Sequence, residues 1–158
     1  MFIVDALIGN WDRHNGNWGF LYDTNTDEMT LAPVYDCGSC LYPQADDLIM
    51  QTVLDDKKER DFRIFEIPTS AIMHNGKRIK YFDFISSLEN EDCNKALRRI
   101  VPRLDMMKIK NVIYATPFLS KLQKEFYMTM LSERKTRILD FALEALCKRE
   151  EIQFIPQF

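Results

Sequence analysis

The sequence predicts a mainly α-helical domain that carries one small β-hairpin. Two apolar runs, 18–22 and 29–34, flank a polar, turn-rich segment over 23–28, a pattern typical of two antiparallel strands joined by a longer loop. From residue 69 onward, most apolar residues recur at helical spacing. The 158 residues suit a single domain with a sizeable core.

Predicted helices occupy six stretches: 1–8, 71–74, 81–88, 91–101, 106–115 and 119–148. The first is a compact apolar run that Gly9 and Asn10 end. Asn90 and Asp105 have side chains suited to capping the fourth and fifth helices. A polar break over 132–136 predicts that the last stretch is an antiparallel pair of helices.

Other parts of the chain give weaker predictions. The charged residues 55–61 fit a solvated loop or the outer face of a helix, and Phe126, Met130 and Phe141 fit the core. Residues 1–150 form the predicted domain and 151–158 a tail. Six basic residues lie close together in the sequence and form a basic cluster: Lys95, Arg98, Arg99, Arg103, Lys108 and Lys110. We interpret them as an exposed face whose charge is balanced by nearby acids, and the alternative is a surface that binds a partner.

Composition excludes several classes of protein. A net charge of −3 argues against a general nucleic-acid binder. No run approaches the roughly 20 apolar residues of a membrane-spanning helix. The N-terminus reaches an acid, Asp5, without a preceding basic segment, so it does not resemble a signal peptide. We therefore expect a cytoplasmic protein with no membrane or direct nucleic-acid partner.

The stretch Asp12-Arg-His-x-x-Asn17, with Asp36 farther along, carries the candidate chemistry. Phosphoryl transfer to a hydroxyl needs a carboxylate that accepts the proton, and oxygen ligands that hold Mg²⁺ on the nucleotide phosphates. If Tyr22 faces Met29 in the hairpin, then Asn17 and Asp36 return to the same end of it. The sequence therefore predicts that both oxygen ligands meet near Asp12.

These motifs resemble the catalytic and metal-binding loops of the HipA-like bacterial Ser/Thr protein kinases, of the HipA and CtkA type. The first motif also resembles the catalytic loop of phosphoinositide lipid kinases, and 31–36 resembles the second metal motif of the HipA-like family. The resemblance implies Asp12 as catalytic base and His14 as support for the loop. It implies Asn17 and Asp36 as ligands for Mg²⁺ and thereby for ATP, with a Ser/Thr protein as substrate.

The resemblance also implies a kinase-like C-terminal lobe, with the catalytic loops and hairpin in 1–43 and a helical subdomain in 69–148. A Gly-rich phosphate loop and a nucleotide-binding Lys strand are missing from the sequence, which has 5 glycines. We therefore expect the N-terminal lobe to be absent, and activity to be weak without an upstream-lobe or antitoxin-like protein partner.

Two alternatives stay open. The chain could be a non-catalytic interaction module, a split or degenerate kinase half that binds a partner protein. A metal-dependent nuclease using Asp12, His14 and Asp36 is disfavoured by the low pI of about 5.4, and it leaves the spacing to Asn17 unexplained.

Cys37 and Cys40 formally make a C-x-x-C motif. A structural zinc site needs a second pair of ligands, and a redox site needs a βαβ setting that the sequence lacks. We expect both cysteines to be free thiols.

Overall fold

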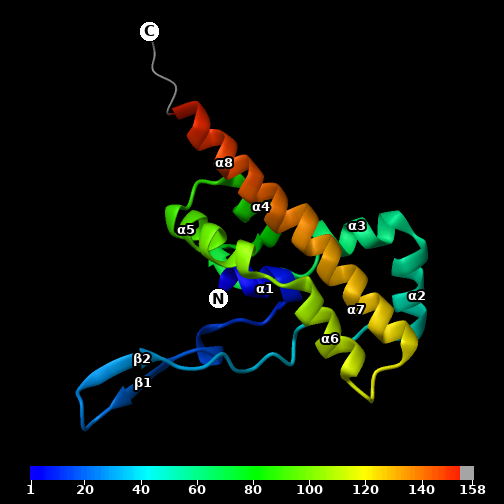
Figure 1. Ribbon diagram of the computed structural model, residues 1–158, viewed down its shortest axis with the longest axis horizontal. Coiled ribbons are helices and arrows are strands. Elements are labelled where there is room, and N and C mark those ends of the chain that lie inside the picture. Colours follow the sequence, from blue (N-terminus) through cyan, green and yellow to red (C-terminus); the bar gives the residue numbers. More distant parts are fainter. Residues whose placement is uncertain (154–158) are drawn as a thin grey trace.

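The computed structural model describes residues 1–153 and confirms a mainly helical fold (Figure 1). The α-helices are α1 (Phe2–Ile8), α2 (Asp47–Asp55), α3 (Lys57–Phe65), α4 (Tyr81–Ser87), α5 (Glu91–Ile100), α6 (Met106–Ala115), α7 (Lys121–Arg134) and α8 (Phe141–Gln153). Three short helical segments join them: the 3₁₀ turns η1 (Asn15–Asn17) and η2 (Val101–Arg103), and the π-helical η3 (Lys135–Asp140).

The predicted hairpin is present, formed by β1 (Phe20–Asp23) and β2 (Glu28–Leu31). Tyr22 pairs with Met29, which confirms the predicted register. The ladder continues toward the body of the protein, because the amide of Ala32 donates to the carbonyl of Gly19 at 2.9 Å. In Figure 1 this hairpin is an arm that stands clear of the helices.

A second hairpin replaces the helix predicted over 71–74, so that prediction is wrong. Strand β3 (Thr69–His74) pairs with β4 (Lys77–Lys80) through Asn75 and Gly76. Both turn residues have positive φ, 50° and 76°, as a two-residue type I′ turn requires. Asn75 and Gly76 therefore turn the chain between two strands, and do not end a helix as predicted.

Local capping signals were accurate. The side chain of Asn90 accepts a hydrogen bond from the amide of Cys93 and starts α5. The side chain of Asp105 accepts from the amides of Met107 and Lys108 and starts α6. Each cap satisfies amides that have no partner inside the helix. The charged residues 55–61, left open between loop and helix, lie across the end of α2 and the first half of α3.

The predicted antiparallel pair over 119–148 is wrong, because α7, η3 and α8 form one continuous rod (Figure 1). The polar residues of the expected break have partners that keep them helical. Lys135 pairs with Asp140 at 2.8 Å, and Glu133 pairs with Arg137 at 3.0 Å. The tail predicted over 151–158 begins inside α8, and its residues 154–158 lie outside the described part.

Arg134 is the buried cation that ties this rod to the rest of the domain. It is 1% exposed, and its Nε donates to the carbonyl of Ala6 near the end of α1 at 2.6 Å. Its Nη1 donates to the carbonyls of Arg63 and Ile64 at the end of α3, at 3.1 and 3.0 Å. The negative ends of two helix dipoles thus face one guanidinium.

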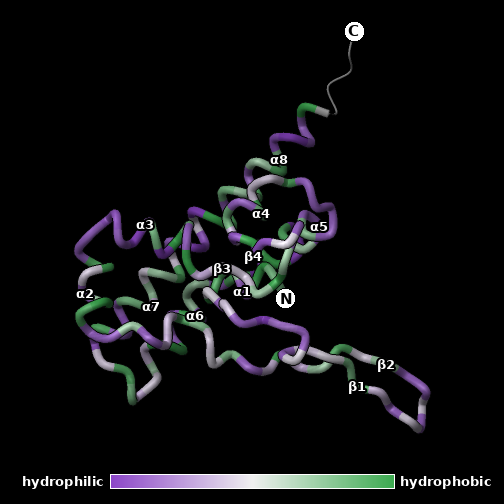
Figure 2. The backbone as a smooth tube through the Cα atoms, turned by 180° about the vertical axis from the view of Figure 1, so that it is seen from behind, coloured by the Kyte–Doolittle hydropathy of each residue, from purple (hydrophilic) through white to green (hydrophobic). Residues whose placement is uncertain are grey.

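The core surrounds α1, which packs against α5 and α7. Figure 2 shows α3 as largely hydrophilic, and it shows hydrophobic stretches along the exposed arm. Phe126 and Met130 are buried as predicted, but Phe141 is 52% exposed and contacts Phe82, so its placement in the core is wrong. Among the described residues, no helix is both long and apolar enough to cross a membrane.

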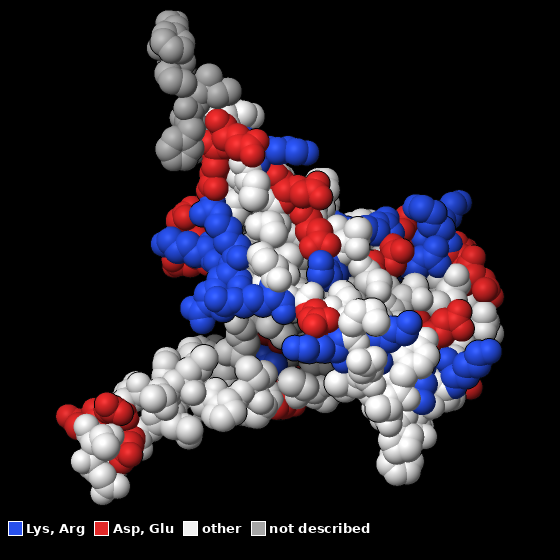
Figure 3. Space-filling view, viewed as in Figure 1, with Lys and Arg blue, Asp and Glu red and all other residues white. Residues whose placement is uncertain are grey.

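The basic cluster gathers over α5 and the segment after it (Figure 3). Part of it is balanced by acids, as the favoured interpretation expected. Arg98 pairs with Glu150, and Lys95 lies 3.4 Å from Asp92. The same view shows the arm as mostly uncharged, with acidic side chains at its tip.

Candidate active site

The site begins where α1 ends, at a glycine whose backbone is in the left-handed region. Gly9 has φ 64°, and its amide and that of Asn10 bond back to the carbonyl of Asp5. A Cβ atom on Gly9 would lie 3.3 Å from Pro68 and 3.7 Å from Tyr42. The turn therefore directs the chain out of the core and into the loop that carries Asp12.

Gly9→Ala should lower the free energy of unfolding by about 1–2 kcal/mol from the left-handed backbone alone. Contact with Pro68 should add to this. Urea unfolding of both Gly9→Ala and Gly76→Ala is the measurement, because Gly76 also has positive φ but has no atom within 4 Å of such a Cβ. Equal losses in the two variants would contradict the crowding at Gly9.

Asp5 and Arg13 form a buried ion pair beneath this loop. They are 2% and 4% exposed, and Arg13 Nη2 lies 3.1 Å from Asp5 Oδ1. Asn10 donates to the same carboxylate at 3.0 Å. Burial opposes the charge on Arg13, but the hydrogen bonds and charge of Asp5 outweigh it, so the pKa of the guanidinium lies above its ordinary value.

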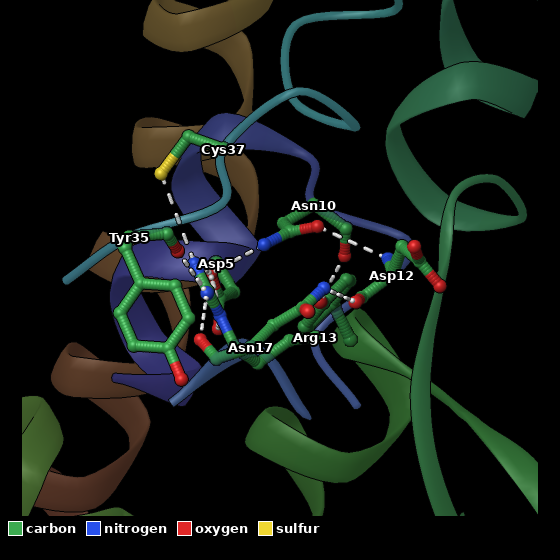
Figure 4. A network of polar contacts seen from close by, with 8 residues as sticks. Asp5, Asn10, Asp12, Arg13, Asn17, Tyr35 and Cys37 are labelled. Carbon is green, nitrogen blue, oxygen red and sulfur yellow. Dashed lines mark hydrogen bonds and ion pairs between the residues drawn. The ribbon is translucent and has the colours of Figure 1, made fainter. Parts of the chain in front are cut away.

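Arg13 also joins the two candidate motifs. Its Nη1 donates to the backbone carbonyls of Asn17 and Tyr35, each at 2.6 Å (Figure 4). The Tyr35 hydroxyl donates to the carbonyl of Gly16 at 3.1 Å. One guanidinium nitrogen therefore brings the residue before Asp36 next to Asn17, at the same end of the hairpin, as the register predicted.

The backbone of Asp12 is fixed by its neighbours. Its amide donates to Asn10 Oδ1 at 3.0 Å, and its carbonyl accepts from the amide of His14 at 2.8 Å and from Asn17 Nδ2 at 2.7 Å. The carboxylate points away from this network in Figure 4 and has no hydrogen-bond partner among the described residues. Residue 12 is therefore fixed through its backbone, while its carboxylate is free to accept a proton.

Asn17 and His14 have different roles in the loop. Asn17 is 4% exposed, and its side-chain nitrogen Nδ2 donates a hydrogen bond to the carbonyl of Asp12. The side-chain oxygen Oδ1 is therefore the atom of Asn17 that is available to a ligand. His14 is exposed, and its Nδ1 accepts from the amide of Gly16 at 2.9 Å. His14 thereby caps η1, the turn that carries Asn17.

Asp36 lies just after the arm returns to the body. Its side chain is exposed, and its backbone has φ 53°, in the left-handed region. Such a conformation is uncommon outside glycine and is seen more often for Asp and Asn. The structure thus leaves this carboxylate open to solvent beside the end of the hairpin.

The donor set fits Mg²⁺ that arrives with phosphates. Mg²⁺ takes oxygen ligands and is usually held by one or two carboxylates together with waters and substrate phosphates. The Asn17 amide oxygen and the Asp36 carboxylate supply such oxygens. Within residues 1–153, no group of three or more His, Cys, Asp and Glu is placed to hold a metal.

The cysteines are free thiols, as predicted. Cys37 is exposed, and its sulfur lies 3.8 Å from Arg13 Nη2. Burial, with the neighbouring Cys37, raises the pKa of Cys40 from 9.0 to about 12. Burial also raises the pKa of Cys93 to about 11.

These pKa shifts predict alkaline destabilisation. Folding raises the two thiol pKa values, so their contribution to stability is complete below the unfolded value near 9 and is lost as pH rises through about 11 and 12. Urea unfolding across that range should show the loss. Cys40→Ala together with Cys93→Ala should reduce it without removing it, because burial also raises the pKa of the Tyr42 and Tyr81 hydroxyls. An unchanged pH profile in the double variant would contradict the assignment.

The polar support beneath the site was not predicted from the sequence, although most of the side chains at its surface were. Asp5, Asn10 and Tyr81 were assigned no part in it, yet the Tyr81 hydroxyl donates to the carbonyl of Asn10. A lone acid within the apolar run 1–8 was the available signal, because a buried carboxylate needs a cation or donors. Its partner could not be identified from spacing alone.

Comparisons with known proteins relate the chain to part of one protein kinase. No protein-family model matches the chain. It is 53% identical over 143 residues to the serine/threonine-protein kinase CtkA of Helicobacter pylori strain J99, which covers 90% of this chain and 44% of that protein. The crystal structure of the H. pylori proinflammatory kinase CtkA superposes with a TM-score of 0.91 at 50% identity, covering 95% of this chain and 55% of that one. The chain thus spans about half the length of its relative.

Proposed function

We propose that this chain, a homologue of part of the serine/threonine-protein kinase CtkA, supplies the catalytic and metal-binding loops of a Ser/Thr protein kinase. In this proposal residues 1–150 form the C-terminal lobe. One observation carries it: Arg13 holds the segment of Asp12 and Asn17 against the segment of Asp36 through two 2.6 Å hydrogen bonds.

Asp12 acts as the proton acceptor for a serine or threonine hydroxyl. Its backbone is fixed by Asn10, His14 and Asn17, so its carboxylate needs little rearrangement to meet an acceptor hydroxyl. Phosphoryl transfer depends mostly on such positioning and on electrostatic stabilisation. His14 supports the loop through its cap on η1.

Asn17 and Asp36 hold Mg²⁺ in this proposal, and the metal, when bound with ATP, neutralises charge on the nucleotide phosphates. The Asn17 amide is oriented by its bond to Asp12, so its oxygen stays available. Asp36 brings the negative charge. The rest of the nucleotide is held by protein outside this chain, because the sequence has no Gly-rich phosphate loop.

The arm offers a surface for that protein. Cross-strand pairing places Phe20 and Tyr22 on one face with Leu31 and Met29. These four side chains are 56–65% exposed. A two-stranded hairpin alone is at best marginally stable in water, so a covering partner, such as an upstream lobe, would stabilise it.

Mg²⁺-dependent binding of ATP tests the metal assignment. The chain should bind ATP weakly alone, and more tightly when the part of CtkA that it does not match is added as a separate polypeptide. Asp36→Asn should weaken Mg²⁺–ATP binding by about tenfold or more, measured by calorimetry.

The matched control is Asp92→Asn, because the Asp92 side chain is 94% exposed on the surface. Asp46 is unsuitable because it caps α2. Equal binding by Asp36→Asn and Asp92→Asn would overturn the assignment.

The exposed arm also favours a second candidate, a non-catalytic module that binds an antitoxin-like or regulatory protein partner. This candidate requires the arm but does not require Asp12, Asn17 or Asp36. Replacing Phe20 and Met29 with serine should abolish partner binding whether the chain is a kinase half or a non-catalytic module. Phosphoryl transfer by the reconstituted protein separates the two, because only the kinase function needs the three polar side chains.

A further inference from the structure

A cavity of about 440 Å³ opens beside the proposed catalytic loop. Its walls include Trp11 from the loop, Tyr42 from the segment after Asp36, Ile49 from α2, Arg63 from α3, and Pro68 from the segment before β3. The walls are mostly apolar, and among the described residues 1–153 Arg63 is the one charged side chain that lines the cavity. Cavities of this size accommodate small ligands or short peptide segments.

The cavity lies next to the residue that would accept the proton. Trp11 lines it and directly precedes Asp12. Gly9, at the start of the same loop, approaches Pro68 and Tyr42 on the cavity wall. The Asp12 carboxylate points away from Asn10 and Asn17 in Figure 4. An acceptor hydroxyl at Asp12 would therefore bring its neighbouring residues close to this cavity.

Arg63 has a fixed backbone and a side chain with no partner. Its carbonyl accepts from the Tyr42 hydroxyl at 2.6 Å and from Arg134 at 3.1 Å. Its Nε is buried without a hydrogen bond, and its guanidinium forms no ion pair within residues 1–153, not even with Glu59 one turn earlier on α3. The Nε is closed to solvent and therefore to a ligand. The two terminal nitrogens are not among the buried atoms and have no hydrogen bond within the described residues, so they are open to an acceptor that a ligand brings.

We propose that this cavity binds an acidic side chain of the protein substrate, close in sequence to the phosphorylated serine or threonine. The carboxylate pairs with the Arg63 guanidinium, whose planar fork of donors matches it. The apolar walls pack against the methylene groups of a glutamate. Arg63 is thus a specificity-determining residue, and the inference rests on the proposed function because Asp12 locates the acceptor.

Peptide binding tests the proposal without requiring catalysis. The probes are fluorescein-labelled peptides with one serine in an alanine background and a Glu placed in turn at each nearby position, with Gln or Leu at the same position as controls. Fluorescence polarisation with the full chain should show about tenfold tighter binding for Glu at one position than for Gln, the gain expected from a charged hydrogen bond. Arg63→Gln should remove that preference, and Arg63→Glu should transfer it to a Lys-containing peptide.

Lys58→Gln is the matched control, because Lys58 is an exposed cation on the same helix and does not line the cavity. Thermal unfolding checks that each variant folds, and the wild-type comparison of Glu with Gln stands without any variant. Equal binding of the Glu and Gln peptides, tighter binding of Leu, or a Glu preference that survives in folded Arg63→Gln would overturn the proposal.

Phosphoryl transfer, assayed separately with the part of CtkA that the chain does not match added, distinguishes the two proposals. A Glu preference that depends on Arg63, without any transfer, supports the cavity and counts against the kinase function. Transfer that is equally fast for Glu and Gln peptides supports the kinase function and overturns the role of Arg63.

Discussion

Asp12→Asn should lower the rate of phosphoryl transfer by about 100- to 10,000-fold, the range for losing a general base. Asparagine has nearly the same shape as aspartate and cannot accept the hydroxyl proton. The hydrogen bonds that fix residue 12 use its amide and carbonyl, so the substitution leaves the loop in place. The measurement is transfer of labelled phosphate from ATP to a serine peptide, with the part of CtkA that the chain does not match supplied as a separate polypeptide.

The matched control is Asp92→Asn, which removes one surface carboxylate from α5 and should leave the rate unchanged. Mg²⁺–ATP binding and the thermal unfolding temperature should stay near the wild-type values in both variants. A rate for Asp12→Asn within a few-fold of wild type would refute the role of Asp12. If the wild-type complex itself transfers no phosphate but still assembles, the interaction module becomes the better account.

Local signals explain what the sequence predicted well. Asn90 and Asp105 cap their helices with bonds to amides two or three residues away, so short spacing alone identifies them. The first hairpin followed from two apolar runs around a polar turn, and its register aligned Asn17 with the segment of Asp36. The surface of the candidate site was therefore available from motif and spacing.

Tertiary contacts explain what the sequence predicted wrongly. Asn75-Gly76 suits both the end of a helix and a type I′ turn, and the pairing of β3 with β4 decides for the turn. The polar residues near 134 suggested a break, but Arg134 reaches carbonyls 70 and 128 positions earlier and stays buried within a continuous helix. Neither the pairing of β3 with β4 nor the distant carbonyls bound by Arg134 can be inferred from the local sequence pattern.

Asp5→Leu should lower the free energy of unfolding by about 3–5 kcal/mol, because it leaves the buried Arg13 charge uncompensated. That is a large part of the roughly 5–15 kcal/mol that stabilises a typical domain. Arg13→Met should cost a similar amount, since it strands Asp5 and also removes the bonds to the carbonyls of Asn17 and Tyr35. Urea unfolding at neutral pH measures both losses.

The double variant Asp5→Leu, Arg13→Met separates stability from the geometry of the site. It should lose less than the sum of the single variants, because no buried charge of the pair remains unpaired. Mg²⁺–ATP binding by the reconstituted protein should nevertheless stay weak, because the two 2.6 Å hydrogen bonds from Arg13 to the carbonyls of Asn17 and Tyr35 are then lost. Additive losses would show that the pair does not act as a unit, and binding restored along with stability would show that Arg13 does not position the two motifs.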